Sequence, residues 1–484
     1  MNMQKHGGRH TDPNLNTRSN RSKTNEGGKI VILKLIHFMI SIAVFYLFWI
    51  LFRYKGFHIV HEKGYRYNYY VLIVYAVLLF ILSRTYNAYL IGYSRLRSLV
   101  FGQFLAQLFS ILLLYITVLV SWAYFVSPGP FIPMLILQLI LDIVWTWCVT
   151  LYFFKIYTKK KTLLIYRDPM DKKRFGSIKG KPSERMYHIT DEMQYDGSFP
   201  ELRPYLEGYD AIFVAGVNSR CRNGILKYCK EKSISGFFLP HVGDVIMQEA
   251  VHVQSFDSPV LYVSRKHLNA EYAVLKRLFD IVISGTALIL FSPVMLITGL
   301  AIHFYDGGPA LYKQVRLTKD GKRFKILKFR SMRVDAEKDG VARLSTGDKD
   351  ERITPIGRFV RKCRLDELPQ LWNIFIGEMS VVGPRPERPE IAEQYYETMP
   401  DFQLRLQVKA GLTGYAQVYG KYNTEPYEKL EFDLLYINHM SFLTDLKLCF
   451  ATVAILFMSE STEGVKEGRT TAMDSDNEEK STEK

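Results

Sequence analysis

The sequence predicts a membrane protein of mixed α and α/β class, and three observations carry that prediction. Four long apolar stretches occupy the first third of the chain and predict an N-terminal four-helix transmembrane bundle over 30–158. Short apolar strands then alternate with amphipathic helices over 159–265, which is typical of a Rossmann-like cytosolic α/β domain. A separate apolar run within 272–304 predicts a re-entrant membrane helix hairpin, followed by a compact, mainly helical domain over 305–458.

Composition limits the class of protein further. The 484 residues exceed one ordinary domain and favour two or three units. The net charge is +15, but Lys and Arg gather beside apolar runs, which favours contact with a membrane surface over nucleic acid. The cysteines form no Cys-x-x-Cys pair and no ligand spacing with His. This argues against a disulfide framework or a zinc site. The cysteines are Cys148, Cys221, Cys229, Cys363 and Cys449.

The four predicted spans cover 30–52, 69–91, 99–126 and 131–154. Each reaches the roughly 20 residues that a helix needs to cross a bilayer. The second is the weakest, because Arg84 and Asn87 interrupt its end. Residues 1–29 are polar and lack the apolar core of a signal peptide, so they predict a disordered basic arm. Residues 459–484 predict a disordered acidic tail.

The distribution of basic residues predicts which side each part faces. Four crossings return the chain to the side on which it starts, and Lys159-Lys160-Lys161 would anchor it at the cytoplasmic face. The uncharged segment Ser127-Pro128-Gly129-Pro130 suits a tight external turn. The parts that follow residue 158 are therefore expected in the cytoplasm.

Within the α/β domain, buried parallel strands are predicted at Thr162–Tyr166 and Asp210–Ala215. A helix is predicted at Asn223–Lys232 and a further strand at Gly236–Leu239. A dinucleotide-binding domain would carry a Gly-rich turn after its first strand, but Arg167-Asp168-Pro169-Met170 stands there. A structural or regulatory module is the favoured interpretation.

The apolar run from Ile281 to Phe304 contains no Asp, Glu, Lys or Arg, and Ser292-Pro293 lies at its middle. Proline removes a backbone donor and clashes with the preceding turn, so we expect the helix to break or bend there. Two arms of about 12 residues would each reach only ~18 Å, too short to cross the bilayer. Basic residues on both flanks also favour two cytoplasmic ends. The alternative is a fifth, proline-kinked crossing.

Chemistry is expected first at the adjacent carboxylates Asp366 and Glu367. Alone, the pair could simply start a helix, since Asp is a favoured N-cap and Pro369 suits a first turn. However, the preceding segment 313–364 is densely basic, which suits a diphosphate substrate or anionic lipid headgroups. Neighbouring carboxylates repel one another, so they need arginines or a divalent cation. We expect Mg²⁺ at this pair, because it binds carboxylate and phosphate oxygens.

Two further segments carry candidate binding residues. Arg385 stands between two prolines, which fix its backbone and its reach toward a phosphate; a solvent-exposed turn is the alternative. Thr413 and Gln417 lie in a glycine-flanked segment that permits close approach of a nucleotide or phosphate. That second signal is weak by itself.

Taken in order, these motifs resemble the bacterial sugar transferase family, in its large form with four membrane helices and a Rossmann-like domain. The resemblance covers about 272–458. The motifs are Lys276-Arg277-Leu-Phe-Asp280, Ser292-Pro293, Gln314-Val-Arg316, Phe324-Lys-Ile-Leu-Lys328-Phe-Arg330-Ser-Met332, Arg352-Ile-Thr-Pro-Ile-Gly357, Leu365-Asp-Glu-Leu-Pro-Gln-Leu371, Met379-Ser-Val-Val-Gly-Pro-Arg-Pro386 and Gly411-Leu-Thr-Gly-Tyr-Ala-Gln-Val418.

The resemblance implies transfer of a sugar 1-phosphate from a UDP-sugar to undecaprenyl phosphate in the bacterial inner membrane, which initiates surface-glycan synthesis. Asp366 would be the nucleophile, and Glu367 would act as metal ligand or proton-transfer group. Membrane lipids would surround the Ser292-Pro293 hairpin, and the sequence leaves the oligomeric state open, a homodimer included. The residues implied in substrate binding are Lys276, Arg277, Gln314, Arg316, Lys328, Arg330, Arg385, Thr413 and Gln417.

Three other interpretations are weighed against this one. A membrane-anchored sugar-nucleotide-modifying enzyme lacks the glycines after Tyr166 that its cofactor would need. A non-catalytic scaffold for glycan assembly or export is disfavoured by the intact pair Asp366-Glu367. A transporter has little support, because no intramembrane charge pair is apparent and Asp142 is the lone acidic residue in a span.

Overall fold

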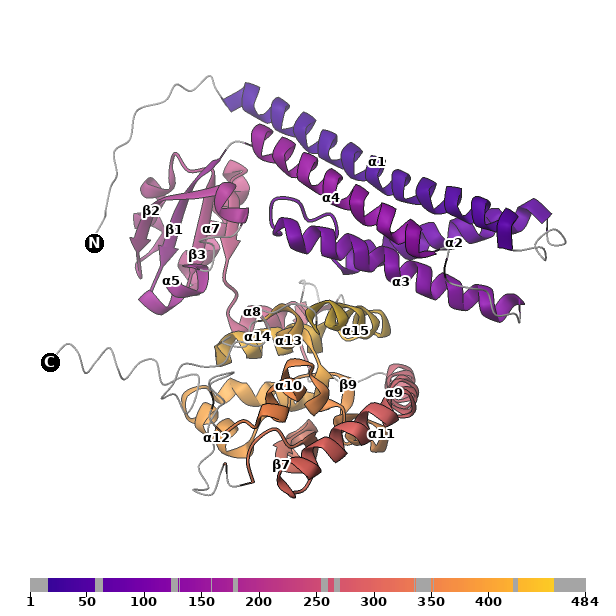
Figure 1. The fold of residues 1–484 in the computed structure, drawn as a ribbon. Helices are drawn as coiled ribbons and strands as arrows, with labels where there is room; N and C mark the ends of the chain where they lie inside the picture. The colour runs from indigo at the N-terminus through magenta and orange to yellow at the C-terminus, as the bar shows by residue number, and fades with distance from the viewer. Residues whose placement is uncertain are drawn as a thin grey trace. The chain divides into compact units, whose positions relative to one another are not determined.

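The protein forms two compact units, 1–239 and 240–484, in a computed structural model (Figure 1). The structure describes residues 16–56, 64–122, 129, 131–157, 159–176, 182–253, 260–264, 270–334, 336, 350, 352–420 and 425–456. The predicted external turn at Ser127-Pro128-Gly129-Pro130 falls outside these ranges except for Gly129, and the predicted tail lies wholly outside them.

The first unit begins with four long helices: α1 (Asn16–Gly56), α2 (Gly64–Thr85), α3 (Leu96–Trp122) and α4 (Phe131–Ile156). All four are long and apolar enough to cross a membrane. They pack in a ring in which each helix contacts two others. α2 ends at Thr85, close to the interruption predicted at Arg84 and Asn87, and Asn87 adopts a left-handed backbone with φ 52°.

One expectation for the bundle is corrected. Residues 16–29 were expected in the disordered arm, but they form the first turns of α1. Adding a residue to an existing helix costs much less than nucleating one, so the apolar helix that follows can extend into a polar sequence. Residues 1–15 of the predicted arm lie outside the described ranges.

The bundle also contains a buried acid–imidazole pair, although no intramembrane charge pair was apparent from the sequence. His37 of α1 lies against Asp142 of α4, with Nε2 and Oδ1 3.1 Å apart. Gln107 of α3 donates to the same oxygen at 3.0 Å, and the Tyr89 hydroxyl lies 3.0 Å from His37 Nδ1. His37 and Asp142 are almost fully buried. The missing partner was not visible in sequence because it lies 105 positions away, on another helix.

A four-stranded parallel sheet completes the first unit. Its strands are β1 (Lys160–Tyr166), β2 (Tyr187–Gln194), β3 (Ala211–Ala215) and β4 (Ser235–Phe238), in the order β2-β1-β3-β4. The predicted strands β1, β3 and β4 and the predicted helix, α7 (Ser219–Lys232), are confirmed. β2 was missed, because this edge strand is largely polar and has few buried residues. The short helices α5 (Pro169–Gly176) and α6 (Phe199–Leu202) connect the strands.

The second unit is mainly helical, as predicted. Its helices are α8 (Val242–Met247), α9 (Ala270–Asp306), α10 (Pro355–Lys362), α11 (Gln370–Ile376), α12 (Pro389–Thr398), α13 (Tyr415–Tyr419), α14 (Pro426–Asn438) and α15 (Phe442–Leu456). Its strands form three pairs: β5 (Val251–Val253) with β6 (Val260–Tyr262), β7 (Leu311–Leu317) with β8 (Arg323–Phe329), and β9 (Ser380–Val382) with β10 (Gly411–Thr413). The last pair is parallel and lies in the main core of the unit.

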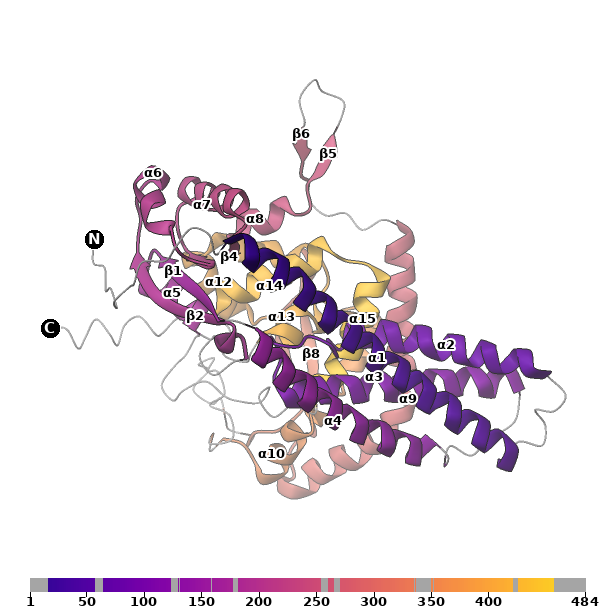
Figure 2. The ribbon, with the colours of Figure 1, turned by 90° about the horizontal axis from the view of Figure 1, so that it is seen from above.

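α9 is the fifth helix long and apolar enough for a membrane. The predicted break at Pro293 is corrected, because the helix continues through this proline, and Figure 2 shows α9 changing direction along its length. Pro293 cannot donate to the Ile289 carbonyl four residues earlier, and the Ser292 hydroxyl donates to it instead at 2.8 Å. This substitute bond lets the helix bend without ending. The re-entrant path stays a prediction.

Candidate active site

The two neighbouring carboxylates lie in a single 3₁₀ turn, Leu365–Glu367, between α10 and α11. Arg364, which precedes the turn, has a left-handed backbone with φ 56°. Pro369 occupies the N-cap position of α11, so neither Asp366 nor Glu367 caps that helix. The interpretation of the pair as a helix start is therefore wrong. The turn instead presents two consecutive side chains to different surroundings.

Glu367 is held in an ion cluster. Arg385 Nη2 donates to Glu367 Oε1 at 2.8 Å, and Lys328 Nζ lies 3.7 Å from the same oxygen. The Glu367 side chain is 15% exposed. Lys328 belongs to β8 and Arg385 follows β9, so segments from three parts of the sequence meet at one carboxylate. The structure thus brings together three of the predicted site residues.

Asp366 has no such partner. No hydrogen bond or ion pair within the described ranges engages its carboxylate. The residue is half-buried, so its side chain remains accessible. Two adjacent carboxylates are therefore in opposite situations: the charge of Glu367 is neutralised within the fold, and that of Asp366 is available for a ligand.

These surroundings separate the pKa values of the two acids. Burial, and then the charge of Glu367, raises the pKa of Asp366 to about 6. Burial also opposes ionisation of Glu367, but the charges of Arg385 and Lys328 outweigh it and hold the pKa of Glu367 well below its usual range. Burial lowers the pKa of Lys328 to about 8. Near neutral pH both carboxylates are ionised, which is the form that a nucleophile requires.

The pair fits a magnesium ion only as one shared with a substrate. Among the residues that the structure describes, no three His, Cys, Asp or Glu side chains lie close enough to hold a metal. Mg²⁺ commonly binds one or two carboxylates together with substrate phosphates and keeps several waters. Asp366 and Glu367 can supply these one or two carboxylates, and the Asp366 oxygens have no other partner among the described residues.

Gln314 and Arg316 lie beside Arg385. Both are on β7, and Gln314 Oε1 accepts from Arg316 Nε at 3.0 Å and from Nη2 at 2.6 Å. Arg316 Nη1 donates to the carbonyl of Pro386 at 3.1 Å. Burial lowers the pKa of Arg316 to about 10, so it remains a cation. These contacts fix a second guanidinium next to the segment that carries Arg385.

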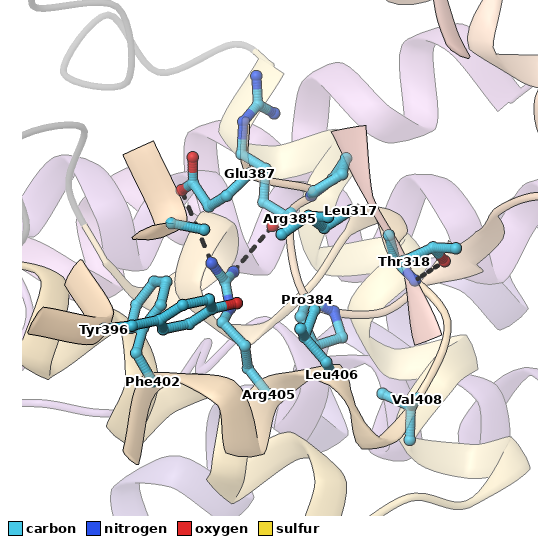
Figure 3. A pocket seen from close by; sticks show the side chains of 13 residues that line it. Leu317, Thr318, Pro384, Arg385, Glu387, Tyr396, Phe402, Arg405, Leu406 and Val408 are labelled. Atoms are coloured by element: carbon cyan, nitrogen blue, oxygen red, sulfur yellow. Dashed lines mark hydrogen bonds and ion pairs between the residues drawn. The ribbon is translucent and has the colours of Figure 1, made fainter. Parts of the chain in front are cut away.

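A small pocket beside this segment contains residues that sequence reasoning missed (Figure 3). Arg405 donates to the backbone carbonyl of Arg385 at 2.8 Å and lies 3.7 Å from Glu387. It also forms a buried ion pair of 2.7 Å with Asp433 of α14. Arg405 thereby fixes the backbone carbonyl of Arg385. Nothing in the spacing of these residues indicated that they would meet.

The other predicted site residues have contacts elsewhere. Lys276 is 8% exposed and its ammonium contacts Asp445 at 2.8 Å. Arg277 donates to the carbonyls of Ile374 and Phe375. The remaining residues have local partners: Arg330 with Asp306, Thr413 with Thr452, and Gln417 with Leu412. Ser292 and Pro293 lie within α9, as described above.

Comparison with known proteins places this geometry in context. Residues 271–459 match the family model described as bacterial sugar transferase. A UDP-glucose:undecaprenyl-phosphate glucose-1-phosphate transferase of Klebsiella pneumoniae is 42% identical over 214 residues, 43% of this chain and 44% of that protein. One of the same description from Caulobacter vibrioides is 38% identical over 191 residues, 38% of this chain and 71% of that protein. The exopolysaccharide production protein PSS of Rhizobium leguminosarum is 39% identical over 200 residues, 40% of this chain and 97% of that protein. The chain thus spans less than half the length of the first of these relatives.

Proposed function

The chain belongs to the bacterial sugar transferase family, and we propose from this that it transfers a sugar 1-phosphate from a UDP-sugar to undecaprenyl phosphate. The product would be the lipid-linked diphosphate sugar that initiates synthesis of a surface glycan such as exopolysaccharide, capsule or O-antigen. The names of three relatives support the class of donor and acceptor, since each is a transferase from a UDP-sugar to undecaprenyl phosphate. The sugar itself is left to experiment.

One observation carries the mechanism: an ionised, unengaged Asp366 lies next to a carboxylate that fixes two cations. The ion pair of Glu367 with Arg385 and Lys328 holds positive charge in place at the position where Asp366 is presented. A diphosphate drawn to those cations would bring its phosphorus within reach of the Asp366 oxygens. Preorganised charge of this kind stabilises the charge that develops during phosphoryl transfer.

In the first step, an Asp366 oxygen attacks the β-phosphorus of the UDP-sugar. A bond forms between that oxygen and phosphorus, and the bond from phosphorus to the bridging oxygen of the diphosphate breaks. The bridging oxygen leaves with the electron pair as part of UMP. The enzyme then carries the sugar phosphate on Asp366 as a mixed anhydride.

In the second step, a phosphate oxygen of undecaprenyl phosphate attacks the same phosphorus. The bond between phosphorus and Asp366 breaks, and the carboxylate regains its electron pair and its charge. The product is the undecaprenyl diphosphate sugar. Dividing the transfer into two steps lets one site serve a soluble donor and a membrane-bound acceptor in turn.

Mg²⁺ is proposed as the cofactor. Asp366 and Glu367 would hold it together with diphosphate oxygens, and it would neutralise charge on the phosphates. In this arrangement Glu367 serves to fix Arg385 and Lys328, and Asp366 serves as the nucleophile. Arg316, which borders the same segment as Arg385, adds positive charge for the diphosphate.

The site is proposed to face the cytoplasm at the inner membrane. The second unit of the protein contains α9, whose side chains are mostly apolar and exposed. The exposed fraction is 79% for Ile289 and 67% for Ile297. Such a surface is expected to be covered by lipid. A UDP-sugar is a cytoplasmic metabolite, and the basic residues that flank α9 favour the cytoplasmic side.

The test is release of UMP. The full-length protein in detergent is incubated with Mg²⁺ and each of several UDP-sugars, with and without undecaprenyl phosphate. The proposal predicts a single equivalent of UMP without acceptor and continuous turnover with it, and neither from Asp366→Asn. A protein that releases no UMP from any donor, although folded, would support a scaffold for glycan assembly or export instead.

A further inference from the structure

We propose that the segment Lys276–Asp280 of α9 positions both residues of the Glu367–Arg385 ion pair. A helix long enough to cross a membrane, together with β9 and α11, which it holds, then forms the support of the active site, here called its frame. The family resemblance assigned Lys276 and Arg277 to substrate. Their contacts in the structure point instead to two backbone segments, one that leads to Arg385 and one that follows Glu367. The inference rests on the proposed function, because it concerns how that site is held in shape.

The first segment held by α9 is β9. Asp280 Oδ1 accepts from the backbone N–H of Val381 at 2.9 Å and from the Ser380 hydroxyl at 3.0 Å. Lys276 Nζ donates to the carbonyl of Val382 at 3.0 Å. Lys276 and Asp280 are four residues apart and so share one face of the helix. Their side chains therefore supply partners along an edge of β9 that β10 does not cover.

β9 leads directly to the catalytic arginine. Val382 is followed by Gly383 and Pro384, and then by Arg385. An added Cβ at Gly383 would lie 2.4 Å from the carbonyl of Lys409, so this connection is tightly packed against the strand beside it. A short, stiff connection transmits a displacement of β9 to Arg385 with little loss. The position of Arg385 is thus fixed through β9 by α9 and directly by Arg405.

The Lys276 side chain is itself held by a buried network. Asp445 Oδ2 accepts from Lys276 at 2.8 Å and from the Tyr272 hydroxyl at 2.8 Å. The Tyr436 hydroxyl lies 2.8 Å from Asp445 Oδ1 and 3.1 Å from the Val382 carbonyl. The ammonium of Lys276 therefore has its hydrogen-bond partners within the protein. A buried and fully engaged cation is poorly placed to receive a lipid phosphate.

The second segment held by α9 is the end of α11. Arg277 donates to the carbonyls of Ile374 and Phe375, each at 2.8 Å. These are among the last carbonyls of the helix, and that of Ile374 also accepts from the Gly377 N–H at 3.0 Å. α11 begins three residues after Glu367. Arg277 therefore fixes the helix that follows the turn with the two carboxylates.

α11 also extends the frame to Lys328. Asn373 Nδ2 donates to the Lys325 carbonyl at 2.9 Å, and Asn373 Oδ1 accepts from the Leu327 N–H at 2.9 Å. Both belong to β8, and Leu327 directly precedes Lys328. Through α11, then, α9 sets the distance between Glu367 and both of its cations.

The experiment separates positioning from direct binding of the lipid phosphate. Release of UMP without acceptor is measured for the full chain and for Asp280→Ala, Asp280→Asn, Arg277→Ala and the control Leu278→Ala, whose side chain is 57% exposed on the same helix. Small errors in the position of reacting groups cost large factors in rate, so Asp280→Ala and Arg277→Ala should slow this step by about tenfold or more. Asp280→Asn, which keeps an acceptor oxygen, and Leu278→Ala should stay near wild type.

Two further readouts exclude a loss of stability alone. Arg385 holds the diphosphate in the proposed mechanism, so its displacement should raise the UDP-sugar concentration that half-saturates UMP release in Asp280→Ala and Arg277→Ala. Amide hydrogen exchange should also increase over residues 378–386 in Asp280→Ala, because the N–H of Val381 loses its acceptor. If Asp280→Ala does not fold, the test uses Arg277→Ala. The Arg277 guanidinium is partly exposed, so its removal should disturb the fold less.

The opposite result is equally clear. If UMP release without acceptor keeps its wild-type rate and half-saturating UDP-sugar concentration in Arg277→Ala and Asp280→Ala, and only the acceptor-dependent step is lost, this segment serves the lipid acceptor and the inference is wrong. A wild-type protein that releases no UMP refutes the proposed function instead. Amide hydrogen exchange over 378–386 in Asp280→Ala then tests by itself whether α9 positions β9. Exchange unchanged from wild type would contradict the inference.

Discussion

At the scale of single residues, the site depends on a difference between two neighbours. Glu367 has its charge neutralised by Arg385 and Lys328, and Asp366 has no partner among the described residues. Adjacent carboxylates would otherwise compete for the same proton and the same cation. The 3₁₀ turn resolves this by directing one side chain to the cluster, and it leaves the other as the group that can react.

The pH dependence of the first step should report the pKa of Asp366. Burial and the charge of Glu367 raise that pKa to about 6, and only the ionised form attacks. UMP release without acceptor should therefore fall as the pH drops through about 6. In Glu367→Gln the neighbouring negative charge is gone, so the limb should move to lower pH. A limb that stays in place in Glu367→Gln would contradict the assignment.

The same raised pKa predicts that Asp366 weakens the fold. A carboxyl whose pKa is higher in the folded than in the unfolded state favours folding when protonated, so stability is lost as the pH rises from about 4 through about 6. Asp366→Asn should therefore have a higher melting temperature than wild type at pH 7.5 and the same one near pH 4. A melting temperature lower than wild type at pH 7.5 would show that the ionised carboxylate has a stabilising partner.

Arg385 should be sensitive to a change that preserves its charge. A guanidinium holds its geometry through a planar set of donors that an ammonium lacks. We therefore expect Arg385→Lys to slow UMP release by about tenfold or more, since removing one preorganised charge contact typically costs that much. Arg323→Lys is the matched control, because Arg323 is 68% exposed and lies 3.9 Å from Glu393. Equal rates in the two variants would remove Arg385 from the mechanism.

At the scale of elements, α9 is the helix on which most of the account depends. It combines an apolar, exposed surface with three polar residues that hold β9 and α11. Pro293 interrupts one backbone hydrogen bond within it, and Ser292 replaces that bond. The element is thus continuous, bent and attached to the site near its N-terminal end.

The re-entrant path of α9 makes a topological prediction. Glu271→Cys and Tyr305→Cys, each in a cysteine-free background and labelled with a membrane-impermeant thiol reagent, should both react only from the cytoplasmic side. Pro293→Ala restores the missing donor, so α9 should straighten and its two ends should label from opposite sides in part of the population. Labelling of the wild-type ends from opposite sides would establish a true crossing.

Several elements followed from the sequence, and the exceptions have physical reasons. Apolar residues predominate in the membrane helices and in β1, β3 and β4, so these elements could be predicted from their own sequences. β2 is polar because it is an edge strand, and α9 continues past Pro293 because one side chain compensates for one missing donor. For β2 the deciding contact is its pairing with β1, which is distant in sequence, whereas for α9 it is the local bond from Ser292 to the Ile289 carbonyl.

At the scale of the whole molecule, local motifs indicated the candidate reacting groups, but not the residues that support them. Asp366, Glu367 and Arg385 were visible as motifs because chemistry needs those residue types together. Arg405, Asp433 and the role of Asp280 were not, because each acts on a partner at least 20 positions away. Contacts at that separation depend on the tertiary fold, and neither propensity nor spacing encodes them.

The membrane bundle has its own buried centre at His37 and Asp142. Asp142→Ala leaves His37 and Gln107 without their shared acceptor, and interhelical polar contacts in membranes contribute about 1–2 kcal/mol at most. We expect a lower melting temperature in Asp142→Ala and a smaller decrease in Asp142→Asn, which keeps an acceptor. Thr150→Ala in α4 is the control. Equal melting temperatures for Asp142→Ala and wild type would mean that the pair does not stabilise the bundle.

The covalent bond that we propose between Asp366 and the sugar phosphate is the central step of the mechanism. The direct measurement is mass spectrometry of the protein after incubation with Mg²⁺ and its UDP-sugar in the absence of undecaprenyl phosphate. We predict that the peptide containing Asp366 gains the mass of one sugar phosphate, that Asp366→Asn gains none, and that added undecaprenyl phosphate removes the label. Turnover with an unlabelled peptide throughout, or a label on another residue, would contradict the central claim.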